Sequence, residues 1–194
     1  MTQLSPRFSV AVTFAAELHR DQFRKGTAIP YLSHLLGVAS LALEHGADED
    51  EAIAAVLHDA IEDQGGATTE ATICRMFGSR VAEIVRACSD TDVQPKPPWR
   101  ERKDAYLRHL RSADASTRLV SASDKLHNAR AILSDLRSHG AAVWTRFNAA
   151  PADILWYYQS LAAEFLRGGP ERLAHEISLV VDEIVVLQHR NAAQ

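Results

Sequence analysis

Four ionisable side chains interrupt an apolar stretch in the segment 54–63, namely His58, Asp59, Glu62 and Asp63. On a helical period of about 3.6 residues, Glu62 lies one turn beyond both His58 and Asp59, so these three side chains could approach one point beside the helix. A bound cation would suit such a point. The alternative is a solvated helix end whose polar groups face water, and the segment alone leaves both interpretations open.

Asp124 and Asn128 align beside the apolar stripe of another predicted helix. This position places the Asp124 carboxylate near the core, where it is unfavourable unless it is ion-paired or binds a cation. We favour a cation, with a salt bridge to a basic side chain as the alternative. A third candidate, His34, follows directly on the loop at Pro30 and is well placed to point into a cleft, although a lone histidine more often has a structural role.

Two imidazoles and two carboxylates form the predicted ligand set of one divalent cation: His34, His58, Asp59 and Asp124. This mixture of nitrogen and oxygen suits manganese, iron or zinc better than calcium or a thiolate-bound metal. Such a cation lowers the pKa of water and polarises a phosphoryl oxygen, which permits hydrolysis without a nucleophilic side chain. Glu62 and Asp63 are the natural candidates to orient or deprotonate the water and to protonate the leaving oxygen.

The elements that must position these residues are helices, because apolar residues recur at intervals of three and four and no run alternates like a strand. We predict an all-α fold of one domain, residues 1–194, with a core over about 6–168 and a C-terminal helix over about 170–190. The other predicted helices cover 6–23, 33–45, a segment capped by Asp48 or Asp50 and closed by Gly65 and Gly66, then 69–77, 79–89, 99–111, 116–138 and 152–167. The segment 90–98 contains three prolines and is predicted to be a loop.

The composition limits the classes of partner. The formal net charge is −4, so no overall positive field would draw the chain to nucleic acid or to an anionic membrane. The apolar stretch 10–16 ends at Glu17, too soon for a secretory signal or a membrane span. We therefore expect a cytoplasmic protein in which Cys74 and Cys88 are reduced thiols. A monomer and a homodimer both stay open.

Several motifs in order resemble the HD-type hydrolases, and within them the RelA/SpoT hydrolase domains and small alarmone hydrolases. They are Phe14-Ala15-Ala16-Glu17-Leu18-His19, Arg24-Lys25, Pro30-Tyr31 through His34, Leu57-His58-Asp59 with Glu62-Asp63, and Asp124-Lys125-Leu126-His127-Asn128. The resemblance implies a single-domain HD-type helical bundle and a metal-dependent phosphohydrolase. It further implies one divalent cation, usually Mn²⁺, and a small-molecule nucleotide substrate. The implied reaction removes the 3′-pyrophosphate of guanosine tetra- or pentaphosphate (ppGpp or pppGpp) and yields GDP or GTP.

The resemblance also implies roles for individual residues. Glu62 and Asp63 match the family's acidic pair, Arg24 and Lys25 its nucleotide-contacting basic pair, and Asn128 a ribose-contacting asparagine. A basic stretch in this region suggests Lys96 and Arg102 as substrate contacts, with an ordinary charged helix start as the alternative. Tyr157 resembles a pocket tyrosine of related hydrolases, with core packing as its alternative.

Two other functions remain open from the sequence. A related enzyme acting on another nucleotide, such as a 5′-nucleotidase, an adenosine-alarmone hydrolase or an NADPH 2′-phosphatase, would keep the same metal ligands. A non-catalytic nucleotide-binding module would be expected to have lost a ligand or an acid, and none is lost here.

Overall fold

The computed structural model describes residues 2–90 and 95–192, and the elements in these ranges are helical apart from one isolated bridge between Phe23 and Pro30. The all-α prediction is confirmed. The elements are α1 Pro6–Leu18, α2 Leu32–Glu44, α3 Glu49–Leu57, α4 Ala60–Asp63, α5 Gly66–Phe77, α6 Ser79–Cys88, α7 Trp99–Ser112, α8 Ala115–His139, the 3₁₀ helix η1 Gly140–Arg146, α9 Pro151–Gly168 and α10 Glu171–Ala192. Among the described residues, none of these helices has the length and apolar character to cross a membrane.

Three elements differ from the prediction. The first helix ends at Leu18 and not near Phe23, because the chain then turns back and Tyr31 N donates to Gln22 O at 2.9 Å. The third predicted helix is divided into α3 and α4 at residues 58–59. Gly140 does not simply end α8 but begins the short helix η1. The non-helical prediction for 90–98 holds at 95–98, and residues 91–94 lie outside the described ranges.

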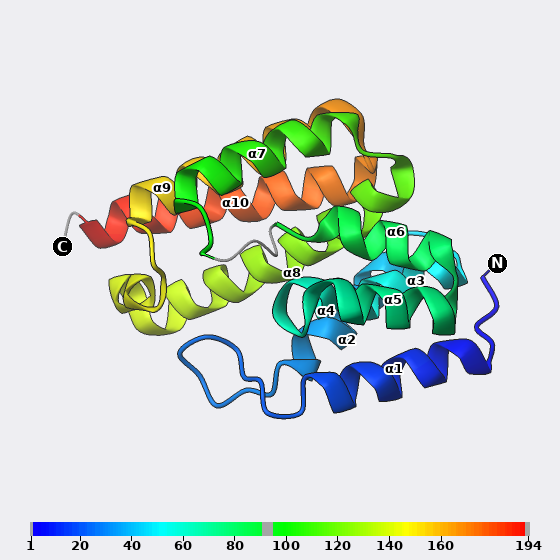
Figure 1. Cartoon of the computed structure of the whole chain (residues 1–194). Coiled ribbons are helices and arrows are strands. Elements are labelled where there is room, and N and C mark those ends of the chain that lie inside the picture. The colour runs from blue at the N-terminus through cyan, green and yellow to red at the C-terminus, as the bar shows by residue number, and fades with distance from the viewer. Residues whose placement is uncertain (1, 91–94, 193–194) are drawn as a thin grey trace.

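Helix α8 is the central element, with a length of about 37 Å. It packs against α2, α3 and α6 on one side and against α9 and α10 on the other, as Figure 1 shows. Its first half is buried in the larger apolar core and its second half in a smaller cluster with α10 and η1. Polar residues 123–125 and 127–128 lie where these two clusters meet. The fold therefore brings a polar segment of α8 into the interior.

The buried side chain of Arg118 fixes the C-terminal helices to α8. Its guanidinium donates to three backbone carbonyls, those of Leu110 at 2.6 Å, Glu164 at 2.7 Å and Gly169 at 3.0 Å. Gly168 leaves room for this group, since a Cβ there would lie 2.6 Å from Arg118 Nη2. The ends of α7 and α9 are thus joined to α8 through one side chain.

Candidate active site

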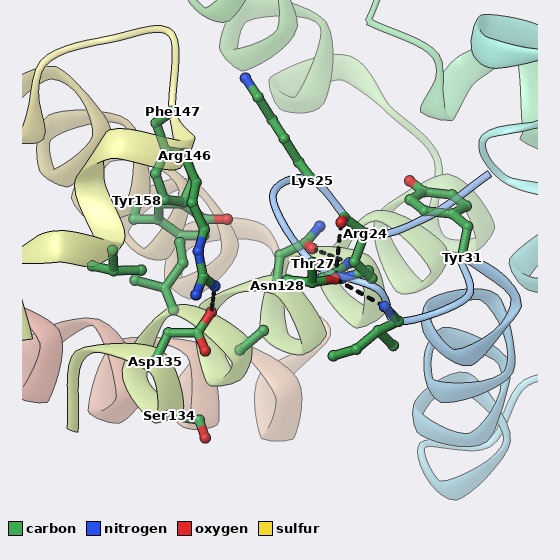
Figure 2. A pocket seen from close by; sticks show the side chains of 14 residues that line it. Arg24, Lys25, Thr27, Tyr31, Asn128, Ser134, Asp135, Arg146, Phe147 and Tyr158 are labelled. Carbon is green, nitrogen blue, oxygen red and sulfur yellow. Dashed lines mark hydrogen bonds and ion pairs between the residues drawn. The ribbon is translucent and has the colours of Figure 1, made fainter. Parts of the chain in front are cut away.

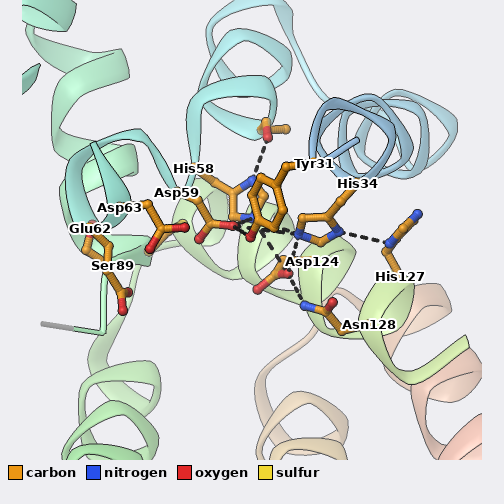
Figure 3. A network of polar contacts seen from close by, with 12 residues as sticks. Tyr31, His34, His58, Asp59, Glu62, Asp63, Ser89, Asp124, His127 and Asn128 are labelled. Atoms are coloured by element: carbon orange, nitrogen blue, oxygen red, sulfur yellow. Dashed lines mark hydrogen bonds and ion pairs between the residues drawn. The ribbon is translucent and has the colours of Figure 1, made fainter. Parts of the chain in front are cut away.

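The four predicted ligands meet between α2, α8 and the α3–α4 junction (Figure 3). His34, His58 and Asp59 offer ligand atoms that all lie within 4.8 Å of one another. Asp124 joins them, because its Oδ1 lies 3.2 Å from His34 Nε2 and 3.6 Å from His58 Nε2. The two Nε2 atoms are 3.3 Å apart, and His58 Nε2 is 2.9 Å from Asp59 Oδ2. Two nitrogens and two oxygens therefore converge on one point.

The other ring nitrogen of each ligand histidine is held by a neighbour. His58 Nδ1 lies 2.9 Å from the carbonyl oxygen of Ala55, and His34 Nδ1 lies 2.9 Å from Nδ1 of His127. Such contacts fix the tautomer and the ring orientation of a histidine that binds metal through its other nitrogen. Both rings are almost fully buried. Because the Nδ1 atom of each ring is held by a neighbour, both Nε2 atoms face the common point.

The electrostatics of this point favour a positive charge. Burial opposes protonation of His58, but the charge of Asp59 and hydrogen bonding with both acids raise the pKa of the imidazole well above its usual range. Burial would raise the pKa of Asp124, yet the charge of Lys125 and hydrogen bonding to His34 and His58 lower it well below its usual range. Both acids are thus ionised around a centre that stabilises a cation.

Asp59 lies at the α3–α4 junction, and its carboxylate faces the other ligand atoms and does not cap α4. Asp59 has φ −98° and ψ −1°, and although it stands at the N-cap of α4 its side chain makes no capping bond. The carboxylate instead accepts a hydrogen bond from Tyr31 Oη at 2.5 Å. The ring of Tyr31 stacks on His19, with centroids 5.5 Å apart, and contacts His34 in a tilted arrangement with centroids 5.3 Å apart. A tyrosine on the loop before α2 therefore orients one ligand acid.

These residues fit a divalent cation. The set offers two imidazole nitrogens whose partner nitrogens are already occupied, together with two ionised carboxylates, a combination typical of manganese, iron or zinc sites.

Glu62 does not join the ligand atoms, contrary to the convergence with His58 and Asp59 that helical spacing predicted. The division between α3 and α4 separates it from them, and Figure 3 shows it to one side of the cluster. Its Oε1 lies 3.0 Å from Lys96 Nζ, and its Oε2 accepts from Asp90 N at 2.9 Å. Glu62 therefore holds the start of the 90–98 loop beside the site.

Asp63 lies on the same side, where its Oδ2 accepts from Gln22 Nε2 at 2.8 Å. The residue retains an exposed edge. Its pKa is raised, first because neighbouring atoms desolvate the carboxylate and second because Asp59 is negatively charged. A carboxyl group of this kind can exchange a proton closer to neutral pH than an ordinary aspartate.

Two connected cavities open beside the ligands. The metal-side cavity, about 420 Å³, is lined by Asp59, Asp124 and the acidic pair, whereas the loop-side cavity, about 470 Å³, lies between the 24–29 loop, the second half of α8 and η1. Five residues line both cavities: Lys25, Tyr31, Asn128, Phe147 and Tyr158. Together the cavities can hold a ligand larger than a single phosphate group.

The metal-side cavity is charge-balanced, because five lysines or arginines and five carboxylates line it. The predicted contact Lys96 is paired with Glu62, while Arg102 and Lys103 are both paired with Asp90. Lys96 and Arg102 both line this cavity, and their role as substrate contacts stays a prediction. Lys96 has an acid of its own, whereas Arg102 shares one with Lys103.

Tyr157 also lines the metal-side cavity, and its ring is packed in the core. Its hydroxyl is buried and makes no hydrogen bond to any described residue. The packing interpretation applies to the ring, and a ligand contact by the hydroxyl stays a prediction. An unpartnered buried hydroxyl is unfavourable in the free protein and is a natural contact for a bound ligand.

The loop-side cavity contains the predicted nucleotide contacts (Figure 2). Arg24 Nη1 donates to Asn128 Oδ1 at 2.9 Å, and Asn128 Nδ2 donates to Asp124 Oδ1 at 2.6 Å. Lys25 Nζ bonds to Asn148 Oδ1 at 2.6 Å. Asn128 therefore connects the ligand set to the loop-side cavity, one helical turn beyond Asp124 as its spacing predicts.

Three contributors escaped assignment from the sequence. Tyr31 hydrogen-bonds to Asp59, His127 contacts His34, and Lys125 is the basic partner of Asp124. All three lie within the motifs of the family resemblance, but the sequence assigned them no role. His127 could have been found from its spacing, because it lies three residues after Asp124 on the same helix face. No local signal identifies Tyr31 as a partner of Asp59.

A family model for the HD domain matches residues 11–155 of this chain. A guanosine-3′,5′-bis(diphosphate) 3′-pyrophosphohydrolase of Xenopus tropicalis is 39% identical over 123 residues, which are 62% of this chain and 66% of that relative. A protein of the same name from Haemophilus influenzae is 34% identical over 124 residues, which are 61% of this chain and 17% of the relative. The matched segment thus spans just under two thirds of the first relative and a smaller part of the second.

A solved structure described as a metazoan ortholog of SpoT that hydrolyzes ppGpp has a TM-score of 0.77 with this chain. The match covers 94% of this chain and 98% of the other, at 24% sequence identity. At that identity the likeness is one of fold, and it extends over nearly all of both chains.

Proposed function

This chain belongs to the HD-domain family, and from that membership we propose that it removes the 3′-pyrophosphate of guanosine tetra- or pentaphosphate, releasing pyrophosphate and GDP or GTP. The observation that carries the proposal is the convergence of His34, His58, Asp59 and Asp124, of which the two acids line the metal-side cavity, beside an adjoining second cavity large enough for a nucleoside. The names of the relatives from Xenopus tropicalis and Haemophilus influenzae support the same substrate.

One divalent cation, which we propose to be Mn²⁺, would be held by these four residues. When bound, it supplies Lewis acidity that polarises a phosphoryl oxygen and acidifies water, and it adds two positive charges to an otherwise balanced cavity. The contacts from His127 and Ala55 to the ligand rings keep both Nε2 atoms aimed at the site throughout.

Asp63 is the proposed proton acceptor for the attacking water. Its Oδ2 is fixed by Gln22, which leaves Oδ1 to take the proton, and its raised pKa suits that exchange. A new bond forms between the water oxygen and phosphorus, the bond from phosphorus to the ribose 3′ oxygen breaks, and that oxygen takes a proton as it leaves. Glu62 holds Lys96 and the backbone at Asp90 against the same cavity, so it positions positive charge beside the departing pyrophosphate.

The remaining contacts divide by cavity. Lys96, Arg102 and the Tyr157 hydroxyl line the metal-side cavity, where the phosphates would lie. Arg24, Lys25 and Asn128 lie at the junction of the two cavities, where the ribose and the adjoining face of the base would lie. A planar guanidinium such as that of Arg24 can stack on a base, whereas lysine offers a compact charge to phosphate.

The direct test incubates the purified protein and Mn²⁺ with ppGpp, GTP, deoxynucleoside triphosphates, nucleoside 5′-monophosphates and NADPH, and resolves the products by ion-exchange chromatography. We expect pyrophosphate and GDP from ppGpp and no product from the others. Orthophosphate from another substrate, with ppGpp untouched, would reject the proposed substrate and assign the cavities to a different nucleotide.

A further inference from the structure

The geometry points to Asp135 and Arg146 as the residues that read the nucleobase and select guanine over adenine. This inference rests on the proposed function, because it places the base of the proposed substrate in the loop-side cavity. Neither residue belongs to the motifs that carry the family resemblance.

The two side chains form a half-buried pair on the wall of the loop-side cavity (Figure 2). Arg146 Nη1 lies 2.7 Å from Asp135 Oδ2, and the side chains are 24% and 34% exposed. Among the described residues, the nearest ionisable partner of Asp135 Oδ1 is His139 Nδ1 at 3.9 Å, beyond hydrogen-bond distance. The Nε and Nη2 atoms of Arg146 likewise make no hydrogen bond within the described ranges. The pair therefore keeps both donors and an acceptor for a ligand.

Guanine matches this arrangement. An ionised carboxylate only accepts hydrogen bonds, so Asp135 suits the N1–H and N2–H donors of guanine. Arginine pairs with the O6 and N7 acceptors of guanine in a bidentate manner. On the guanine ring, the O6 acceptor lies beside the N1–H donor. In the protein, the accepting carboxylate of Asp135 likewise lies beside the donating guanidinium of Arg146. Adenine presents an acceptor at N1 and a donor at N6, so it would place an acceptor against the carboxylate.

The surrounding chain holds the pair at a suitable position. The Arg146 stem lies over Gly26, where a Cβ would fall 2.9 Å from Arg146 Cγ. Asp135 follows Asp124 by three turns of α8, an axial distance of about 16 Å, which is on the scale of a nucleoside carrying a 3′-diphosphate. Between them, Ile132, Ile29 and Tyr158 provide apolar walls for a flat ring.

The test measures binding of GDP and ADP by calorimetry in the presence of Mn²⁺, so that base preference is read without turnover. The variants are Asp135→Ala and Arg146→Met, the second of which keeps the stem over Gly26. Glu183→Ala is the matched control, because it breaks the exposed Arg137–Glu183 pair that also involves α8 but lies outside both cavities.

We expect the wild type to prefer GDP and each cavity variant to weaken GDP binding roughly ten- to a hundredfold, with ADP binding changed less than about twofold. The control should keep the preference. The inference would be overturned if the wild type bound GDP and ADP equally or bound neither. It would also be overturned if Asp135→Ala lost affinity for both nucleotides to the same extent. A protein that prefers GDP in this way but leaves ppGpp intact would reject the proposed function alone.

Discussion

The imidazole of His127 occupies the space that a side chain on Gly37 would need. A Cβ at Gly37 would lie 2.3 Å from His127 Nε2 and 2.4 Å from its Cδ2. The absence of a side chain in α2 thus lets a residue of α8 reach His34, whose Nδ1 lies 2.9 Å from His127 Nδ1. A glycine that touches no ligand atom therefore determines how one ligand ring is held.

Gly37→Ala should displace His127 and lower Mn²⁺ affinity about 10- to 100-fold, the usual effect of losing a group that orients a metal ligand. Isothermal titration with Mn²⁺ measures this effect. Ser40→Ala, on the exposed face of α2, is the control and should leave the affinity unchanged.

The clash between a side chain at position 37 and His127 predicts that substitutions of these two residues have non-additive effects on Mn²⁺ affinity. In a His127→Ala background there is no ring to displace, so Gly37→Ala should lower metal affinity little further. If the two substitutions instead reduced the affinity independently, Gly37 would act through something other than His127.

Asp124 and Glu62 should separate metal binding from turnover. Asp124→Ala should abolish both, whereas Glu62→Gln should keep Mn²⁺ affinity within about twofold and lower kcat by up to about 10²-fold, because a neutral amide no longer holds Lys96 in place by an ion pair. Asp124→Asn should preserve the fold better than Asp124→Ala, because the amide keeps the size of the side chain and an oxygen that can accept a hydrogen bond from the buried Lys125. Full activity of Glu62→Gln would show that the acid has no part in the reaction.

Asp63→Asn should stabilise the metal-free protein at neutral pH. The pKa of Asp63 is raised above its ordinary 3.8 in the folded state, so ionising it lowers stability as the pH rises through that window. An asparagine stays neutral and still accepts from Gln22. In EDTA, the melting temperature of the variant should exceed that of the wild type near about pH 7.5, and this difference in melting temperature should shrink below about pH 4. An advantage that is the same at every pH would contradict the assigned shift.

Tyr157→Phe should leave the free energy of unfolding within about 0.5 kcal/mol of the wild type, because the hydroxyl it removes has no partner among the described residues. The kcat/KM for ppGpp should fall roughly two- to tenfold. The matched variant is Tyr106→Phe, whose buried hydroxyl donates to Ser121 at 2.9 Å and whose loss should cost about 1 kcal/mol in urea unfolding. Equal destabilisation by both would mean that Tyr157 has an unrecognised partner.

The helices themselves could be predicted because apolar periodicity and the positions of glycine and proline are local signals. Helix ends were wrong where a distant contact decides them. Nothing in the sequence marks residues 58–59 as a break, since neither glycine nor proline stands there, and Asp59 instead bonds to Tyr31, 28 residues earlier. The end of α1 likewise depends on the return of the chain toward Gln22.

The candidate site shows the same division. Asp124 and Asn128 are one turn apart on a single helix, so their alignment follows from spacing alone. The contact between His34 and His127 depends on how α2 crosses α8, and the pairing of Lys96 with Glu62 joins residues 34 positions apart. Residue types could thus predict four side chains that converge, whereas the contacts that hold His34 and Asp59 in place depend on the three-dimensional arrangement.

Because five basic and five acidic side chains line the metal-side cavity, the cavity without a bound cation projects little net field beyond about 10 Å at ordinary ionic strength. The metal-free cavity therefore does not draw in a nucleotide from a distance, and the rate of nucleotide association with the metal-free protein should change little when salt is added. Selection at the metal-free entrance would then depend on how a ligand fits on contact and not on attraction of its charge from a distance.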